Sequence, residues 1–269
     1  MLGHPMWSNL QQLPRYRGLI QTLVARELKA RYRGSVLGFV WSFINPLLLL
    51  TIYSIVFTAF LPASKDLPTP YPLFMFCGIL PWTWFAASLT EASGSLISGG
   101  NLIRKVLFPA EVLPIVTVFS NLVHFLLGLP ILILFLIAYG HYPVPLHLLW
   151  FPVVVVVQLV LTIGLGLILA SLTVHFRDIR DILQNVLTLW FFATPIIYPW
   201  FQAGIKEHKR LFDLNPFTHL AIAYQEIFFF QDGFGAWKGL GADAILAVVV
   251  FLAGYWLFDR LRDSFAEVV

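Results

Sequence analysis

Long apolar runs separated by short polar segments make up most of the chain. A helix needs about 20 predominantly apolar residues to cross the hydrocarbon core of a bilayer. Runs of this kind predict six membrane spans, at residues 37–61, 71–93, 111–138, 147–173, 182–200 and 242–258. We therefore expect an all-α membrane protein with a six-span domain at 37–259, a cytoplasmic N-terminal segment at 1–36 and a cytoplasmic tail at 260–269.

The composition excludes an ordinary soluble domain. Hydrophobic residues make up 59% of the 269 residues, charged residues only 12%, and the mean hydropathy is +0.81. Soluble domains carry about 25% charged residues. The single cysteine, Cys77, rules out an intrachain disulfide, and no group of cysteine and histidine residues has the spacing of a zinc site.

The positive charges predict the orientation, because lysine and arginine are enriched on the cytoplasmic side of membrane proteins. Six spans place both termini on one side. Of the 17 lysine and arginine residues, 12 fall on that side and 5 on the other. Both termini are therefore predicted to be cytoplasmic.

A basic, amphipathic segment precedes the first span. Within residues 15–34, apolar positions alternate with arginine and lysine at helical spacing, and Glu27 and Arg31 are four residues apart, which predicts an ion pair. Such a helix is too charged to span and is expected at the cytoplasmic interface. It serves either as a positively charged anchor or as a docking element for a partner, and the sequence leaves both open.

The sequence lacks the common motifs for nucleotide binding, zinc-dependent hydrolysis and serine-based hydrolysis. The sequence contains no G-x-x-x-x-G-K-[ST] phosphate loop, no H-E-x-x-H pair and no G-x-S-x-G elbow. If a nucleotide drives this protein, another chain binds it. The interiors of the predicted spans hold almost no charged residues, since Glu91 lies near a span end and Asp243 and Asp259 lie at the edges of the last span; this argues against ion-coupled transport. His124, alone in the third span, is interpreted as a hydrogen-bonded packing residue.

Aromatic residues are abundant, at 16% of the chain. In the first span they follow one helical face, and others cluster in the second and fifth spans. The candidates for a wall along which sugar rings slide are Phe39, Phe43, Tyr53, Phe57, Trp82, Trp190 and Tyr198. Helix packing and interfacial aromatic belts are the alternative explanation for each of them.

Two cytoplasmic loops carry charge. The loop NLIRKVLFP at 101–109 is apolar and basic, and is expected to form a surface helix that fits a partner's groove. The loop HFRDIRDIL at 175–183 alternates arginine and aspartate. It is either a solvated turn with local ion pairs, each worth less than about 1 kcal/mol, or a gate at the mouth of the bundle.

Four segments occur in the order of a known family. They are RELKARYRGSVLGFVWSFINPLLLLTIYSIVF, LPWTWF, HFRDIRDILQNVLTLWFFATPIIYP and LNPFTHLAIAYQEIF. From about residue 20 to the C-terminus, the chain resembles the permease subunit of ABC-2 type exporters of cell-surface polysaccharides, the group that includes O-antigen and teichoic acid transporters. The resemblance implies a bacterial inner-membrane protein that pairs with a second copy of itself.

The resemblance also implies two separate ATPase subunits that bind ATP and Mg²⁺, so that this chain binds no cofactor itself and contacts no nucleic acid. The ATPase would contact the interfacial helix and the loop helix at 101–108. The residues assigned to this coupling are Glu27, Arg104, Lys105 and Phe108. Short helices within 203–231 would dip into the outer leaflet, and the first and fifth spans would line the channel.

A mechanism follows from this resemblance. A lipid-linked polysaccharide approaches from the cytoplasmic leaflet, and its diphosphate is attracted to arginine side chains, whose forked donors suit phosphate. The candidates for this lipid-phosphate site or gate are Arg31, Arg33, Arg177 and Arg180.

Other functions remain open on the sequence. One is a related exporter of a small hydrophobic molecule or a lipooligosaccharide, which a narrower path would favour. Another is a membrane-embedded lipid-modifying enzyme, which would need a convergent polar site with a nucleophile. A scaffold subunit fits less well, because it needs no aromatic stripe along a span.

Overall fold

The computed structural model describes residues 13–60, 67–103, 108–202 and 207–268, and within these ranges the regular elements are all helical. This confirms the predicted all-α class. The longer helices are α2 (Arg17–Arg31), α3 (Trp41–Ile55), α4 (Tyr71–Ser98), α6 (Val112–Ala138), α8 (Phe151–His175), α9 (Ile179–Phe192), α12 (Thr218–Phe228) and α13 (Trp237–Val268). The short ones are η1 (Leu13–Tyr16), η2 (Gly38–Val40), η3 (Val56–Phe60), α5 (Gly100–Ile103), α7 (Pro145–Leu148) and α11 (Lys209–Asp213).

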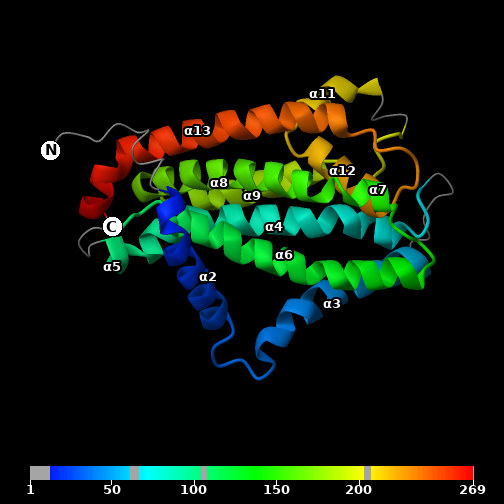
Figure 1. Cartoon of the computed structure of the whole chain (residues 1–269), viewed down its shortest axis with the longest axis horizontal. Coiled ribbons are helices and arrows are strands. Elements are labelled where there is room, and N and C mark those ends of the chain that lie inside the picture. The colour runs from blue at the N-terminus through cyan, green and yellow to red at the C-terminus, as the bar shows by residue number, and fades with distance from the viewer. Residues whose placement is uncertain (1–12, 61–66, 104–107, 203–206, 269) are drawn as a thin grey trace.

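Five helical segments in the described ranges are long and apolar enough to cross a membrane: Gly38–Ile55, Tyr71–Ser98, Val112–Ala138, Pro145–His175 and Trp237–Phe265. Helices α4, α6, α8, α9 and α13 run side by side along the long axis of the molecule (Figure 1). Helix α5 and the end of α13 lie at one end of this bundle, and α7, α11 and the start of α13 lie at the other (Figure 1). We refer to the end with α5, which the family resemblance places toward the cytoplasm, as the inner end, and to the opposite end as the outer end.

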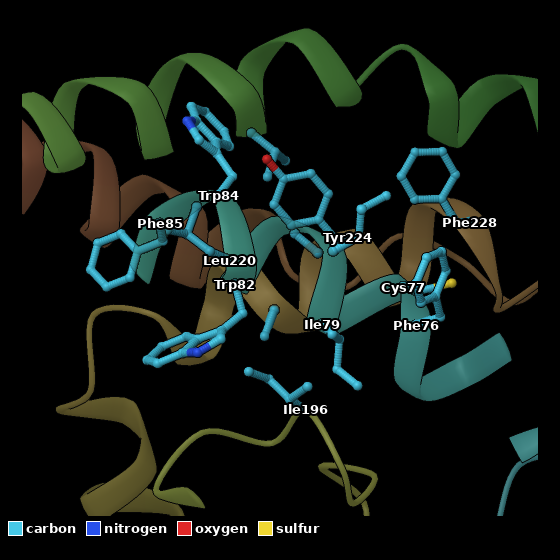
Figure 2. Packing of buried hydrophobic residues seen from close by; sticks show 14 of the residues in the cluster. Phe76, Cys77, Ile79, Trp82, Trp84, Phe85, Ile196, Leu220, Tyr224 and Phe228 are labelled. Carbon is cyan, nitrogen blue, oxygen red and sulfur yellow. The ribbon is translucent and has the colours of Figure 1, made fainter. Parts of the chain in front are cut away.

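Helix α4 is the centre of the bundle, and it is buried along most of its length. Its aromatic side chains pack against the partner helices, as Figure 2 shows for Trp82, Trp84 and Phe85. Trp84 stacks on Phe125 of α6 with ring centroids 5.1 Å apart. The hydroxyl groups of the buried α4 residues Ser93 and Ser95 donate to carbonyls of the same helix, so these two add no unsatisfied donor to the apolar interior.

Two glycines allow helices α8 and α13 to approach closely. A Cβ atom at Gly164 would lie 2.7 Å from the backbone of Phe251, and one at Gly254 would overlap the carbonyl oxygen of Gly164. Small residues at such crossings permit backbone contact between membrane helices. The α8–α13 pair is therefore fixed by its glycines.

The fifth predicted span, residues 182–200, differs from the prediction. Helix α9 has 14 residues, about 21 Å of helix, which is shorter than the roughly 30 Å hydrocarbon core. Beyond Phe192 the chain continues without helix and reaches Tyr71 at the start of α4, whose hydroxyl donates to the Ile197 carbonyl. Whether this segment completes a sixth crossing stays a prediction.

Side chains satisfy the backbone of this non-helical segment. Asn215 donates to the Ala193 carbonyl at 3.0 Å, and Gln225 donates to the Pro195 carbonyl at 2.9 Å. Non-helical backbone at membrane depth is tolerated only where protein groups replace the missing hydrogen bonds. The segment after α9 therefore depends on residues from the following helical region.

That region, predicted to hold short re-entrant helices, contains α11 and α12. Helix α12 is almost wholly buried. Phe217, just before it, contacts Trp82 and Phe85 of α4 at centroid distances of 4.9 Å and 4.8 Å. Trp82 lies 11 residues into α4, about 16 Å from its outer end. Short helices are present in this region, whereas their re-entrant character stays a prediction.

Helices α2 and α3 form a V beside the bundle (Figure 1). Helix α2 packs on α6, and α3 packs on α4 and α6. The turn between them contains Gly34 and Gly38, whose positive φ angles of 79° and 51° suit glycine.

Candidate functional site

A charged cavity lies at the inner end of the bundle, where α2, α4, α6 and α9 converge. Its volume is about 700 Å³, within the range of about 300–1,000 Å³ typical of ligand sites. We call it the basic pocket. The charged residues that line it are Arg26, Glu27, Arg31, Glu91 and Arg180.

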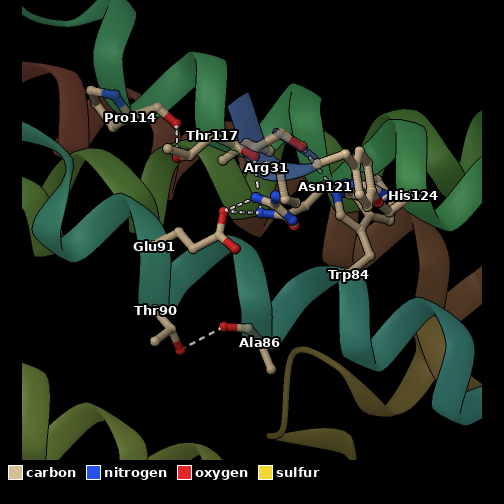
Figure 3. Close-up of polar contacts among 11 residues, drawn as sticks. Arg31, Trp84, Ala86, Thr90, Glu91, Pro114, Thr117, Asn121 and His124 are labelled. Carbon is tan, nitrogen blue, oxygen red and sulfur yellow. Dashed lines mark hydrogen bonds and ion pairs between the residues drawn. The ribbon is translucent and has the colours of Figure 1, made fainter. Parts of the chain in front are cut away.

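Arg31, the last residue of α2, is held by a network that spans three helices (Figure 3). Its Nη2 donates to Glu91 Oε2 at 2.7 Å, and its Nη1 donates to Asn121 Oδ1 at 3.2 Å. Asn121 in turn donates through Nδ2 to the same Glu91 oxygen at 2.8 Å. The guanidinium group is therefore fixed in position at the pocket wall.

Arg180, from the first turn of α9, reaches the same pocket across α4. Its guanidinium group lies over Gly94, and a Cβ atom at this position would collide with it. Gly94 is therefore the reason that a bulky cation fits against the inner end of α4. The arginine reaches the pocket without an ion pair to any described residue.

The pocket carries an excess of positive charge. Three arginine residues border it against two glutamates. One of those glutamates, Glu91, is already engaged by Arg31, and the paired side chains are 28% and 36% exposed. Guanidinium groups bind phosphate oxygens through paired donors, so the arrangement suits an anionic group of diphosphate size.

Of the four predicted phosphate-binding arginines, the structure brings Arg31 and Arg180 together at the pocket. Arg33 and Arg177 are exposed and do not border it. The predicted ion pair between Glu27 and Arg31 is wrong, because Arg31 pairs with Glu91 from another helix instead. Within the described ranges, the loop at 175–183 forms no local ion pairs either.

A shallow groove lies between α3 and α9 over the surface of α4. Its volume is about 380 Å³. Tyr53 and Trp82 of the predicted channel wall border it, together with polar side chains such as Thr90 and Gln184. We call it the α3–α9 groove. Its mixture of aromatic and polar groups is compatible with passing sugar rings.

The other predicted channel residues do not border this groove. Phe39 and Phe43 contact each other edge-to-face near the start of α3, and Phe57 stacks with Tyr53. Trp190 packs on Trp82 and donates to Asn215 Oδ1 at 2.6 Å, while Tyr198 donates to the Phe192 carbonyl. These contacts show packing roles within this chain, and their channel role stays a prediction.

Of the four residues predicted to couple this chain to an ATPase, the structure describes two. Glu27 borders the basic pocket, Phe108 is half-buried, and Arg104 and Lys105 lie outside the described residues. The sequence did not indicate Glu111, which is 2% exposed and faces Arg262 of α13 at 3.6 Å. This pair ties the loop after α5 to the C-terminal helix.

The sequence analysis also missed Asn121 and Gly94. An asparagine in the middle of an apolar run is a signal, because buried amides in membrane helices bond across helices. Gly94 carries no signal, since glycine is frequent in such helices. Among the described residues, no group of three His, Cys, Asp or Glu side chains is placed to hold a metal ion.

Comparison with known proteins agrees with this architecture. The family model described as "ABC-2 type transporter" matches residues 18–229. An O-antigen export system permease protein of Myxococcus xanthus is 42% identical over 97% of this chain and 98% of its own length. A protein of the same name from Klebsiella pneumoniae is 31% identical over 93% of this chain and 95% of its own.

More distant similarity extends to a polysialic acid transport protein of Escherichia coli, which is 20% identical over 75% of this chain and 77% of its own length. The family model covers most of the chain, and the two O-antigen export permeases match the chain almost end to end. The predicted resemblance is confirmed, and the chain belongs to the ABC-2 type transporter family.

Proposed function

We propose that this chain is the membrane permease subunit of an ATP-driven exporter that moves a lipid-linked polysaccharide out of the cytoplasm. The family and the O-antigen export permeases that resemble it support a transport role over an enzymatic one. The basic pocket is the single structural observation that carries the proposal furthest, because it offers an anion site at the inner end of a membrane bundle.

The basic pocket suits the diphosphate of a lipid carrier. Arg26 and Arg31 line it from α2, and Arg180 lines it from α9. A diphosphate that enters between these helices meets guanidinium donors from two elements. Its apolar tail stays in the bilayer beside α2, along a groove between α2 and α6 whose lining is apolar except for Arg17 and Gln21.

ATP and Mg²⁺ bind to separate ATPase subunits in this proposal, and this chain binds no cofactor. The 269-residue sequence lacks a phosphate loop, which supports the separation. The ATPase docks on the inner end of the bundle, at α5 and the loop after it, where Arg104, Lys105 and Phe108 occur. The pairing of Glu111 with Arg262 passes movement of that loop to α13.

A homodimer forms the channel in this proposal. Apolar side chains on α3 and α9 are exposed in the single chain, including Leu48, Ile52, Ile182 and Leu189. The two helices flank the α3–α9 groove. A second copy that covers these faces would close the groove into a conduit for a polymer, with six crossings per chain and both termini in the cytoplasm of a bacterial inner membrane.

Reconstitution tests the function directly. Proteoliposomes that contain this chain and its ATPase are loaded with a fluorescent lipid-linked polysaccharide, and ATP-dependent movement across the bilayer is measured by protection from an added glycosidase. We expect transport only with both subunits present, and weaker assembly and hydrolysis when Arg104 and Lys105 are both replaced by glutamate.

Two results would contradict the proposal. One is a chain that never associates with the ATPase. The other is a complex that hydrolyses ATP in response to a small hydrophobic molecule or lipooligosaccharide and ignores the polymer, which would favour the related exporter of small substrates.

A further inference from the structure

A second cavity lies on the other side of Arg31, under the first half of α3. Its volume is about 400 Å³, and α2, α3, α4 and α6 contribute its walls. We call it the α3 cavity. The lining residues used below are Arg31, Tyr32, Trp41, Asn45, Thr83 and His124.

The α3 cavity is built on a polar network that connects three helical elements. The Tyr32 hydroxyl bonds to Ser42 Oγ at 2.6 Å and to His124 Nδ1 at 3.2 Å. This network fixes the V between α2 and α3 against α6. His124 was predicted to be a hydrogen-bonded packing residue, and these bonds confirm it.

Two polar groups at the cavity remain unsatisfied within the described part of the chain. The Nε2 atom of His124 is buried there without a hydrogen-bond partner. The Asn45 side chain is exposed on α3 and forms no hydrogen bond to a described residue. An amide can donate two hydrogen bonds and accept two. Asn45 lines the cavity from an exposed position on α3, so its amide is free to bond to a polar ligand in the cavity.

The α3 cavity also lies between the two parts of the site already described. It shares Arg31 with the basic pocket, and it shares Thr83 with the α3–α9 groove. Thr83 lies eight residues before Glu91 on α4, about 12 Å deeper into the bundle. A ligand whose charged group sits against Arg31 therefore has a polar continuation that leads toward the groove.

We propose that the α3 cavity binds the first sugar of the lipid-linked glycan, the one attached directly to the diphosphate. The inference rests on the proposed function, since it places the diphosphate in the basic pocket on the other side of Arg31. It assigns Asn45 and Thr83 as sugar-contacting residues that determine specificity.

The lining matches a sugar better than a second phosphate. Arg31 is the one cation among the lining residues, and Glu91 and Asn121 already engage it. The other polar groups are neutral amide, hydroxyl and imidazole groups, which both donate and accept, as sugar hydroxyls require. Trp41 is 36% exposed and adds an aromatic surface for the apolar face of a sugar ring.

The test compares two probe types on the full-length chain in lipid nanodiscs. One is decaprenyl diphosphate, and the other is decaprenyl diphosphate that carries a single glucopyranose or a single N-acetylglucosamine. Binding is followed by competition with radiolabelled decaprenyl diphosphate. For the wild-type chain we expect at least one sugar-bearing lipid to bind about tenfold more tightly, which corresponds to two or three added hydrogen bonds.

Asn45→Leu, which keeps the size of the side chain and removes the amide, is expected to reduce the tenfold gain to twofold or less while the affinity for the sugar-free lipid stays unchanged. Thr83→Val is expected to reduce the gain partly. Thr51→Val is the matched control, because Thr51 is exposed on α3, the helix that carries Asn45, and lies outside the α3 cavity.

The outcomes distinguish a failure of the sugar site from a failure of the phosphate site. If the sugar-free lipid binds and neither sugar adds affinity, the α3 cavity is not a sugar site, and the proposed function is untouched. If the gain survives Asn45→Leu, the sugar lies elsewhere. If the sugar-free lipid fails to bind at all, the phosphate site of the proposed function is wrong, and this inference is overturned with it.

Discussion

Replacing Glu91 with glutamine should strengthen the binding of a lipid diphosphate. The Glu91 carboxylate accepts a hydrogen bond from Arg31 Nη2 at 2.7 Å and so takes the position that a phosphate oxygen would need. An incoming diphosphate must therefore displace this carboxylate. Glutamine keeps the size of the side chain and an oxygen that accepts from Asn121 and Arg31, but removes the competing charge.

The size of the effect follows from the geometry of the pair. The two side chains are 28% and 36% exposed, so solvent screens their attraction. Partly exposed ion pairs are worth about 0.2–1 kcal/mol, and about 1.4 kcal/mol corresponds to a factor of ten in affinity. Glu91→Gln should therefore tighten the binding of decaprenyl diphosphate by a factor between about 1.4 and 5.

The assay is equilibrium binding of radiolabelled decaprenyl diphosphate to the full-length chain in nanodiscs. Asp178→Asn is the matched control, because it removes the same charge at the inner end of the bundle from an exposed residue that does not border the basic pocket. Unchanged or weaker binding in Glu91→Gln, with the control also unchanged, would refute the idea that Glu91 holds the place of the phosphate.

Two further predictions concern the helix pair and the inner end of the bundle. Gly254→Ala should lower the thermal unfolding midpoint by several degrees, because the added methyl group overlaps the Gly164 backbone and overpacking costs about 1–3 kcal/mol. Gly241→Ala in the same helix has open space around it and gains helix propensity, so it should keep or raise the midpoint. Arg262→Glu should reduce ATP-driven transport and thermal stability by leaving the buried Glu111 unpaired. The double variant Arg262→Glu with Glu111→Arg should recover transport and thermal stability. A double variant that recovers neither would contradict a direct pairing of the two residues.

Features that depend on local composition could be predicted from the sequence. Apolar runs predicted the helices that now form α3, α4, α6, α8 and α13, because spanning length is readable from one segment at a time. The aromatic stripe of the first span also follows from helical spacing. The family resemblance came from motifs spread along the chain.

Features that depend on contacts between distant segments were not readable. Arg31 has a glutamate four residues before it, yet it pairs with Glu91, 60 residues away, because α2 ends against α4 and α6. The run at 182–200 is mostly apolar, and Pro195 marks a break near its end, but beyond Phe192 the free backbone groups take hydrogen bonds from Asn215 and Gln225, which lie outside the run. Propensity and periodicity contain no information on either partner.

The position of the lipid-phosphate site is the central claim, and transport by matched arginine variants tests it most directly. Arg180→Gln borders the basic pocket, whereas Arg33→Gln and Arg177→Gln remove exposed arginines that do not. Charge-assisted hydrogen bonds are worth about 1.5–3 kcal/mol. In proteoliposomes with the ATPase, we predict that Arg180→Gln lowers the rate of lipid-linked polysaccharide export at limiting substrate about tenfold or more, and that the other two variants stay within twofold of wild type. Equal effects of all three substitutions, or wild-type transport in Arg180→Gln, would contradict the account.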